Sequence, residues 1–166
     1  TAAKDVEEKS SELVDAATQG SNDLSISGWK FTEPALLAAK REALIAALEH
    51  LFDKKLIKKT RATYWDADKS TRAVCSVSKR YEGAVPYWYA FHPKWDEFLA
   101  TGERSVFVLG TVDLGFCFVL PHDLIREHLS ELNTTQKPDG SAYWHIKILE
   151  PSQGSYFLQM PKTGNH

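Results

Sequence analysis

The chain has 166 residues, of which 43% are hydrophobic and 25% charged, the composition of one globular domain with a sizeable core. The net charge of −2 excludes attraction of nucleic acid by the molecule as a whole, so any such binding requires a local basic patch. No apolar run approaches the roughly 18 residues of a membrane span, and no signal peptide is present, so we expect no membrane partner.

The cysteine content indicates a reducing compartment. Cys75 and Cys117 are the two cysteines of the chain, and both lie in apolar, strand-like segments. Thiols in such segments are typical of reduced, buried side chains and not of a disulfide framework or a zinc site. We therefore predict that both thiols are free and that the protein is cytoplasmic.

The first part of the chain differs from the rest. Residues 1–27 have few apolar positions and end in a polar, turn-rich stretch, which predicts a loosely attached helix and linker. Residues 28–166 then form a single domain. Because the chain begins with Thr1 and not with Met, we expect another domain N-terminal to residue 1.

The strongest helical pattern opens the main domain. Thr32 is suited to cap a helix, and Pro34 is suited to its first turn. Apolar side chains, among them Leu44 and Leu48, then recur at helical spacing. We predict a helix that ends at about Phe52.

The densest positive charge of the chain follows this helix. It consists of Lys54, Lys55, Lys58, Lys59 and Arg61. Cations at this place complement the negative end of the helix dipole, which is one interpretation of the cluster. The other interpretation is contact with the phosphates of a nucleic acid, with DNA as the expected partner.

The remaining elements alternate between strands and short helices. We predict strands over residues 61–66, 71–78, 87–91, 105–109, 116–120, 143–149 and 156–160, and helices over 93–100 and 123–132. This order predicts an α+β domain with a single mixed, largely antiparallel sheet and helices packed on it. The predicted core comprises Leu44, Leu48, Val77, Val106, Val108, Phe118, Leu120, Ile125, Leu129 and Ile146.

An aromatic stretch that contains histidine, Tyr81–Leu99, is the most distinctive part of the sequence, and Tyr143–His145 repeats its combination of residues. Such aromatic residues are usually core. On neighbouring strands they would instead line a partly open pocket that stacks on a base. Lys79 and Arg80, just before the stretch, are placed to hold phosphates. The predicted pocket comprises Tyr87, Trp88, Tyr89, His92, Trp144 and His145.

No common catalytic motif is present, and the sequence leaves the cofactor unknown. The element order over residues 34–120, a helix, three strands, a helix and a strand, resembles the core of the restriction-endonuclease-like PD-(D/E)xK nucleases. This resemblance implies a Mg²⁺ site drawn from Asp66, Asp68, Lys79, Glu42 and Glu49. The acid of the family's acid-x-lysine motif is replaced by Val77. We therefore expect neither a tight Mg²⁺ site nor nuclease activity from this domain alone.

The segments YWYAFHP and YWHI also resemble small uncharacterised bacterial domains of restriction and mobile-element neighbourhoods. Together with the basic cluster, this resemblance predicts a nucleic-acid-binding module of a bacterial DNA-processing or defence system. A protein–protein or small-ligand interaction module is the first alternative. A Mg²⁺-dependent nuclease is the second.

Overall fold

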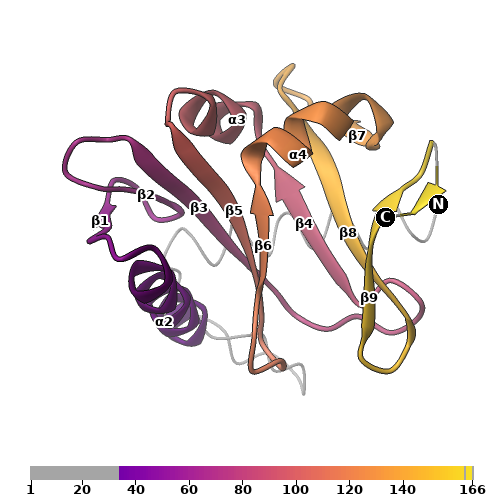
Figure 1. Cartoon of the computed structure of the whole chain (residues 1–166). Coiled ribbons are helices and arrows are strands. Elements are labelled where there is room, and N and C mark those ends of the chain that lie inside the picture. The colour runs from indigo at the N-terminus through magenta and orange to yellow at the C-terminus, as the bar shows by residue number, and fades with distance from the viewer. Residues whose placement is uncertain (1–33, 163, 166) are drawn as a thin grey trace.

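The computed structural model describes residues 34–162 and 164–165, so the predicted N-terminal helix and linker, residues 1–27, and the Thr32 cap lie outside the described residues. None of the helices within these ranges is long and apolar enough to cross a membrane. In chain order the elements are α2 (Pro34–Phe52), β1 (Ile57–Lys58), β2 (Thr63–Trp65), β3 (Thr71–Ser78), β4 (Tyr87–Phe91), α3 (Pro93–Ala100), β5 (Arg104–Thr111), β6 (Phe118–Pro121), α4 (His122–His128), the short 3-10 helix η1 (Leu129–Glu131), β7 (Thr134–Gln136), β8 (Ala142–Ser152), β9 (Ser155–Met160) and β10 (Gly164–Asn165) (Figure 1).

The strands form two sheets and not the single sheet that the sequence predicted. Sheet A has the order β1-β2-β3-β5-β6, and sheet B has the order β10-β9-β8-β4, with β7 also paired to β8. In sheet A, β3 and β5 are parallel and the other pairs are antiparallel. The pairs of sheet B are antiparallel. The class is thus α+β with a mixed sheet, as predicted, but the division into two sheets corrects the prediction.

The second sheet arises because β4 does not continue the meander of β2 and β3. β3 pairs instead with β5, in parallel register from the pair Thr71 and Arg104 to the pair Ser78 and Thr111. Parallel neighbours need a crossover connection, and both β4 and α3 lie within this one. β4 pairs with β8 in sheet B, and α3 then returns the chain to sheet A.

The main core lies between the two sheets. Tyr87, Tyr89 and Phe91 of β4 all point into it, because alternate side chains of a strand share one face. Val74 of β3 and Phe107 of β5 meet them from sheet A. α3 and α4 close one end of this core, at the top of Figure 1.

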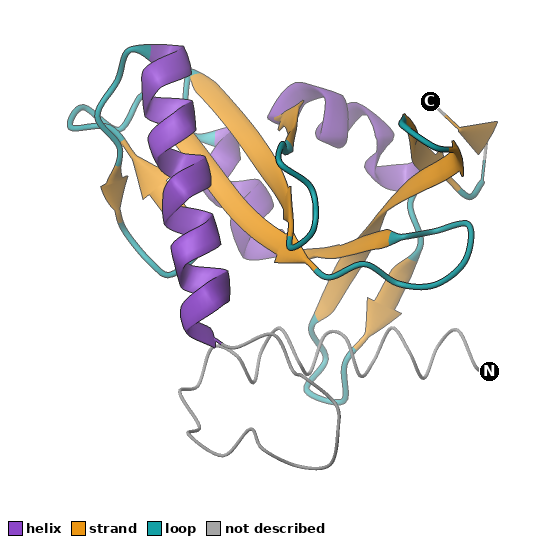
Figure 2. Ribbon diagram, turned by 90° about the horizontal axis from the view of Figure 1, so that it is seen from below, coloured by secondary structure: helices purple, strands orange, loops and turns teal. Residues whose placement is uncertain are grey.

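A second core lies on the other face of sheet A, beneath α2 (Figure 2). Leu44 and Leu48 of α2 belong to it, as does Cys75 of β3. Burial raises the pKa of the Cys75 thiol to about 12, so the thiolate that reacts with oxidants or metals is not formed near neutral pH. Cys117, just before β6, is half-buried, and both thiols are free.

Most of the predicted core is buried, and the exceptions lie at the margins of their elements. Phe118, Leu120 and Leu129 are only half-buried, while the other seven predicted residues are buried. Phe118 and Leu120 belong to β6, which is the edge strand of sheet A and therefore has only one strand beside it. Leu129 begins η1, where the regular helix has ended.

A substitution in α2 tests this packing. We expect Leu48→Ala to lower the free energy of unfolding by about 2–4 kcal/mol, because it opens a cavity between α2 and sheet A. Leu51→Ala on the same helix is the matched control, since Leu51 is 68% exposed and its loss should change stability by less than about 0.5 kcal/mol. Urea unfolding measures both values, and equal effects of the two changes would contradict the placement of α2.

Candidate functional site

A half-buried tryptophan, Trp65, ends β2 where positively charged side chains gather. Lys59 precedes β2, Lys69 lies in the turn between β2 and β3, and Arg72 is the second residue of β3. The ring of Phe98, from α3, packs against the indole with the ring centroids 5.7 Å apart. These five residues, from three different parts of the chain, are called the Trp65 patch below.

The three cations of the patch converge on the indole ring. Lys59 Nζ lies 4.5 Å from the ring centroid of Trp65, Lys69 Nζ lies 4.9 Å from it, and Arg72 Cζ lies 5.1 Å from it. No two of these charges can therefore be more than about 10 Å apart, which is close to one Debye length at 0.1 M salt. The positive charges repel one another, and the electron-rich ring face offsets part of that repulsion.

Backbone contacts fix the Arg72 cation in place. Its Nε donates a hydrogen bond of 2.9 Å to the Lys69 carbonyl oxygen, and its Nη1 donates one of 3.0 Å to the Phe98 carbonyl oxygen. The Phe98 carbonyl belongs to the last turn of α3, where carbonyl groups have no intrahelical partner. Arg72 thus satisfies a helix end and is held against the Trp65 and Phe98 rings at the same time.

A buried carboxylate shapes the turn that carries Lys69. Asp66 accepts hydrogen bonds from the Thr71 backbone N–H at 3.0 Å and from the Ser70 hydroxyl at 3.2 Å, and it pairs with Lys54 at 3.6 Å. Burial opposes ionisation of Asp66, but these contacts outweigh it and lower the pKa of the carboxyl. Lys69 adopts the left-handed conformation, with φ of 64°, which the closed turn stabilises.

The patch retains its positive charge. Within the described residues, Lys59, Lys69 and Arg72 form no ion pair with a carboxylate, whereas Lys54 and Lys55 each form one. Three unneutralised cations beside an aromatic ring are the features that bind phosphates and a base. The arrangement therefore suits an anionic ligand with a flat ring.

Only one member of the predicted basic cluster belongs to the Trp65 patch, namely Lys59. Lys54 and Lys55 are paired with Asp66 and Glu49, Lys58 is exposed on β1, and Arg61 is half-buried between β1 and β2. Sequence reasoning missed the members beyond the cluster, which are Trp65, Lys69, Arg72 and Phe98. The signal was a tryptophan flanked by cations on both sides, in the segment KKTRATYWDADKSTR.

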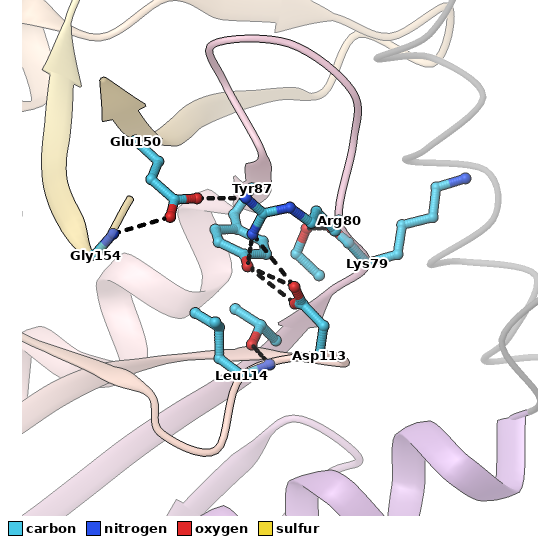
Figure 3. Close-up of polar contacts among 9 residues, drawn as sticks. Lys79, Arg80, Tyr87, Asp113, Leu114, Glu150 and Gly154 are labelled. Carbon is cyan, nitrogen blue, oxygen red and sulfur yellow. Dashed lines mark hydrogen bonds and ion pairs between the residues drawn. The ribbon is translucent and has the colours of Figure 1, made fainter. Parts of the chain in front are cut away.

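Arg80 links β4, β8 and the loop after β5 through its side chain. Its guanidinium donates to the Tyr87 hydroxyl at 2.7 Å and pairs with Asp113 and Glu150, while Tyr87 donates to Asp113 at 2.9 Å (Figure 3). Burial and the Asp113 carboxylate raise the pKa of Tyr87 to about 12. Two carboxylates thus neutralise Arg80, which disfavours phosphate binding there. The Lys79 side chain extends away from this network (Figure 3).

The predicted aromatic pocket is divided between the two faces of sheet B. Tyr87, Tyr89 and Trp144 point into the main core. Trp88 points to the opposite face, where its ring lies 5.5 Å from that of His145. The reason is the alternation of side chains along β4 and β8, which places neighbouring residues of one strand on different faces.

Trp88 and His145 lie side by side, as predicted, but in a buried hydrogen-bonded pair. The Trp88 indole N–H donates to His145 Nδ1 at 2.9 Å, and His145 Nε2 lies 2.6 Å from the Thr135 hydroxyl. Because an indole N–H can only donate, Nδ1 of His145 is the acceptor. Trp88 is 6% exposed and His145 is 3% exposed, so neither presents an open surface. His92 is half-buried nearby, with its ring 5.8 Å from that of Tyr143.

The residues that the nuclease resemblance implied do not come together. Asp66 and Asp68 lie before β3 and Lys79 lies after it, and the eight residues of that strand span about 23 Å. Glu49 accepts the Leu56 backbone N–H at 2.9 Å, and Glu42 is exposed on α2. Within the described residues, no group of three or more His, Cys, Asp or Glu side chains is placed to hold a metal ion.

Comparison with known proteins assigns no family. No protein-family model, no curated protein and no solved structure matches the chain. The inference of function therefore starts from the Trp65 patch.

The buried pair of Trp88 and His145 predicts a specific loss of stability. Trp88→Phe keeps an aromatic ring but removes the indole N–H, which leaves His145 Nδ1 without its donor. We expect the free energy of unfolding to fall by about 1–3 kcal/mol. Trp144→Phe is the control, because the half-buried Trp144 packs in the main core without a side-chain hydrogen bond among the described residues. Equal losses in urea unfolding would show that the hydrogen bond contributes nothing.

Proposed function

We propose that this domain binds single-stranded nucleic acid through the Trp65 patch. The observation that carries the proposal is the gathering of three cationic groups within 5.1 Å of one indole ring. None of the three is neutralised by a carboxylate of the described residues. A single strand offers phosphates to the cations and an unpaired base to the ring.

The charge of the whole chain determines how such binding behaves. With a net charge of −2, the protein has no long-range attraction for a polyanion, so affinity comes from the patch itself. Three phosphate contacts on a single strand give a slope of about −2 for the logarithm of the binding constant against the logarithm of salt concentration. Base stacking adds about 1–3 kcal/mol for each base and depends little on salt.

A single strand fits the patch better than a duplex. In a duplex the bases are stacked on one another and present only their edges, so the indole ring could contact the backbone alone. In a single strand an unpaired base can reach the ring while its phosphates contact the lysines and Arg72. We propose that the domain binds nucleic acid in this way as a module of a bacterial DNA-processing or defence system.

Two matched lysine variants test the proposal. We expect Lys59→Gln to weaken binding of a labelled single-stranded oligonucleotide about fivefold at 0.1 M salt and to reduce the salt slope by about 0.7, because one phosphate contact is lost. Lys55→Gln removes the same charge from a side chain that lies outside the patch, and it should leave both values unchanged. Fluorescence anisotropy across a salt series measures them.

Three results would contradict the proposal. Equal weakening by both variants would show that overall charge and not the patch determines binding. Tighter binding of the matching duplex would remove the role of the unpaired base. Failure of the oligonucleotide to bind, with binding of an acidic peptide, would favour the interaction-module alternative.

A further inference from the structure

A histidine and a carboxylate are buried together where α3 meets α4. His122 Nε2 lies 2.7 Å from Asp96 Oδ1, and Arg126 Nη2 donates to Asp96 Oδ2 at 3.4 Å. His122 is 4% exposed and Asp96 is 8% exposed. Since arginine can only donate, Asp96 accepts from Arg126 through Oδ2, while its Oδ1 faces Nε2 of His122.

The other ring nitrogen of His122, Nδ1, has no hydrogen-bond partner within the described residues. Among the described residues, the only fully buried side-chain nitrogen or oxygen without a partner is Nε of Arg41. Nδ1 of His122 is not among these fully buried atoms, although it forms no hydrogen bond within the described residues. It is therefore in contact with space that solvent can reach. His122 also lines a polar cavity of about 90 Å³, together with Gly102, Ser105 and Arg126. In general, an imidazole that donates from Nε2 to a carboxylate has its lone pair on Nδ1, the atom that acts as a general base.

This cavity adjoins the Trp65 patch at the end of α3. Gly102 lines the cavity, and a Cβ atom placed on Gly102 would lie 3.0 Å from Cγ and Cδ of Arg72. Arg72 also bonds to Phe98, in the last turn of the same helix. Arg72 of the patch and His122 of the cavity therefore lie on either side of the end of α3.

We propose that His122 is a catalytic residue that cleaves RNA bound on the Trp65 patch. The proposal rests on the proposed function, because the patch has to hold the strand. RNA has a nucleophile of its own, the 2′-hydroxyl, next to each phosphodiester. One positioned base is then sufficient to start the reaction, whereas DNA has no such hydroxyl and is bound without cleavage.

The step is a transesterification within the RNA. Nδ1 of His122 takes the proton of the 2′-hydroxyl, and the 2′-oxygen forms a bond to the adjacent phosphorus. The bond between phosphorus and the 5′-oxygen of the next nucleotide breaks, and the proton passes from Nδ1 to that oxygen. The products are a 2′,3′-cyclic phosphate and a free 5′-hydroxyl, and no other reactant is consumed.

The surrounding charges have separate parts in this reaction. Asp96 orients the imidazole and stabilises the imidazolium that forms when Nδ1 takes the proton. Arg126 lines the cavity as a positive charge for the reacting phosphate. Glu103 and Asp123 also line the cavity, but both are exposed, so water and salt screen their repulsion of the phosphate.

Binding and cleavage of one labelled RNA strand, measured on the same full-chain samples in EDTA, test the proposal. We expect wild-type protein to yield a 2′,3′-cyclic phosphate end. His122→Gln should lower the cleavage rate at least about 100-fold while binding stays unchanged, because the amide of Gln can donate to Asp96 but has no basic nitrogen. Asp96→Asn should also slow cleavage, and it replaces His122→Gln as the test variant if His122→Gln does not fold. His128→Gln, outside the cavity, is the control and should cleave normally.

The outcomes separate this proposal from the proposed function. RNA that is bound but not cleaved by the wild-type protein would overturn the catalytic role and leave nucleic-acid binding intact. Cleavage that persists in folded His122→Gln, or that yields ends other than the cyclic phosphate, would also overturn it. RNA that is not bound at all would overturn the proposed function itself.

Discussion

The hydrogen bond from Arg72 to the Phe98 carbonyl joins the two candidate sites of this molecule. It satisfies a carbonyl at the end of α3, and it places a guanidinium against Trp65, where β2 ends and β3 begins. The same bond fixes the end of α3 relative to β3, and α3 carries Asp96, the partner of His122. The position of one cation thus couples the sheet, the helix and both candidate sites.

This bond in turn depends on the parallel pairing of β3 and β5. Because parallel neighbours need a crossover, the chain leaves sheet A after β3 and returns through α3. The crossover brings the start of β3 and the end of α3 to the same edge, although they are more than twenty residues apart. A plain antiparallel meander of β2, β3 and β4 would have left the Trp65 patch without Phe98 and without its fixed arginine.

Local patterns in the sequence predict the elements well but not their pairing. The strands 71–78 and 87–91 and the helix 93–100 have the predicted bounds, because alternation, aromatic content and Pro93 are local signals. The division into two sheets depends on which strand pairs with β3. That choice is made by contacts between distant segments, so the linear sequence does not contain it as a local signal.

The candidate site shows the same division between local and distant information. Trp88 and His145 were expected to meet, and they do, because both belong to strands that pair. Their burial agrees with the interpretation of the aromatic residues as core and not with an open pocket, and the alternation of side chains alone does not say which face of a strand is covered. Trp65 was overlooked because its partners come from a turn, a neighbouring strand and a distant helix.

The indole N–H signals of the tryptophans, followed by NMR during titration with a single-stranded oligonucleotide, test the central claim most directly. Trp65→Phe identifies the signal of Trp65, and Trp88→Phe identifies that of the buried Trp88. We predict that the Trp65 signal shifts progressively and that the Trp88 signal stays in place. A shift of the Trp88 signal with a constant Trp65 signal, or no shift of either, would contradict the account.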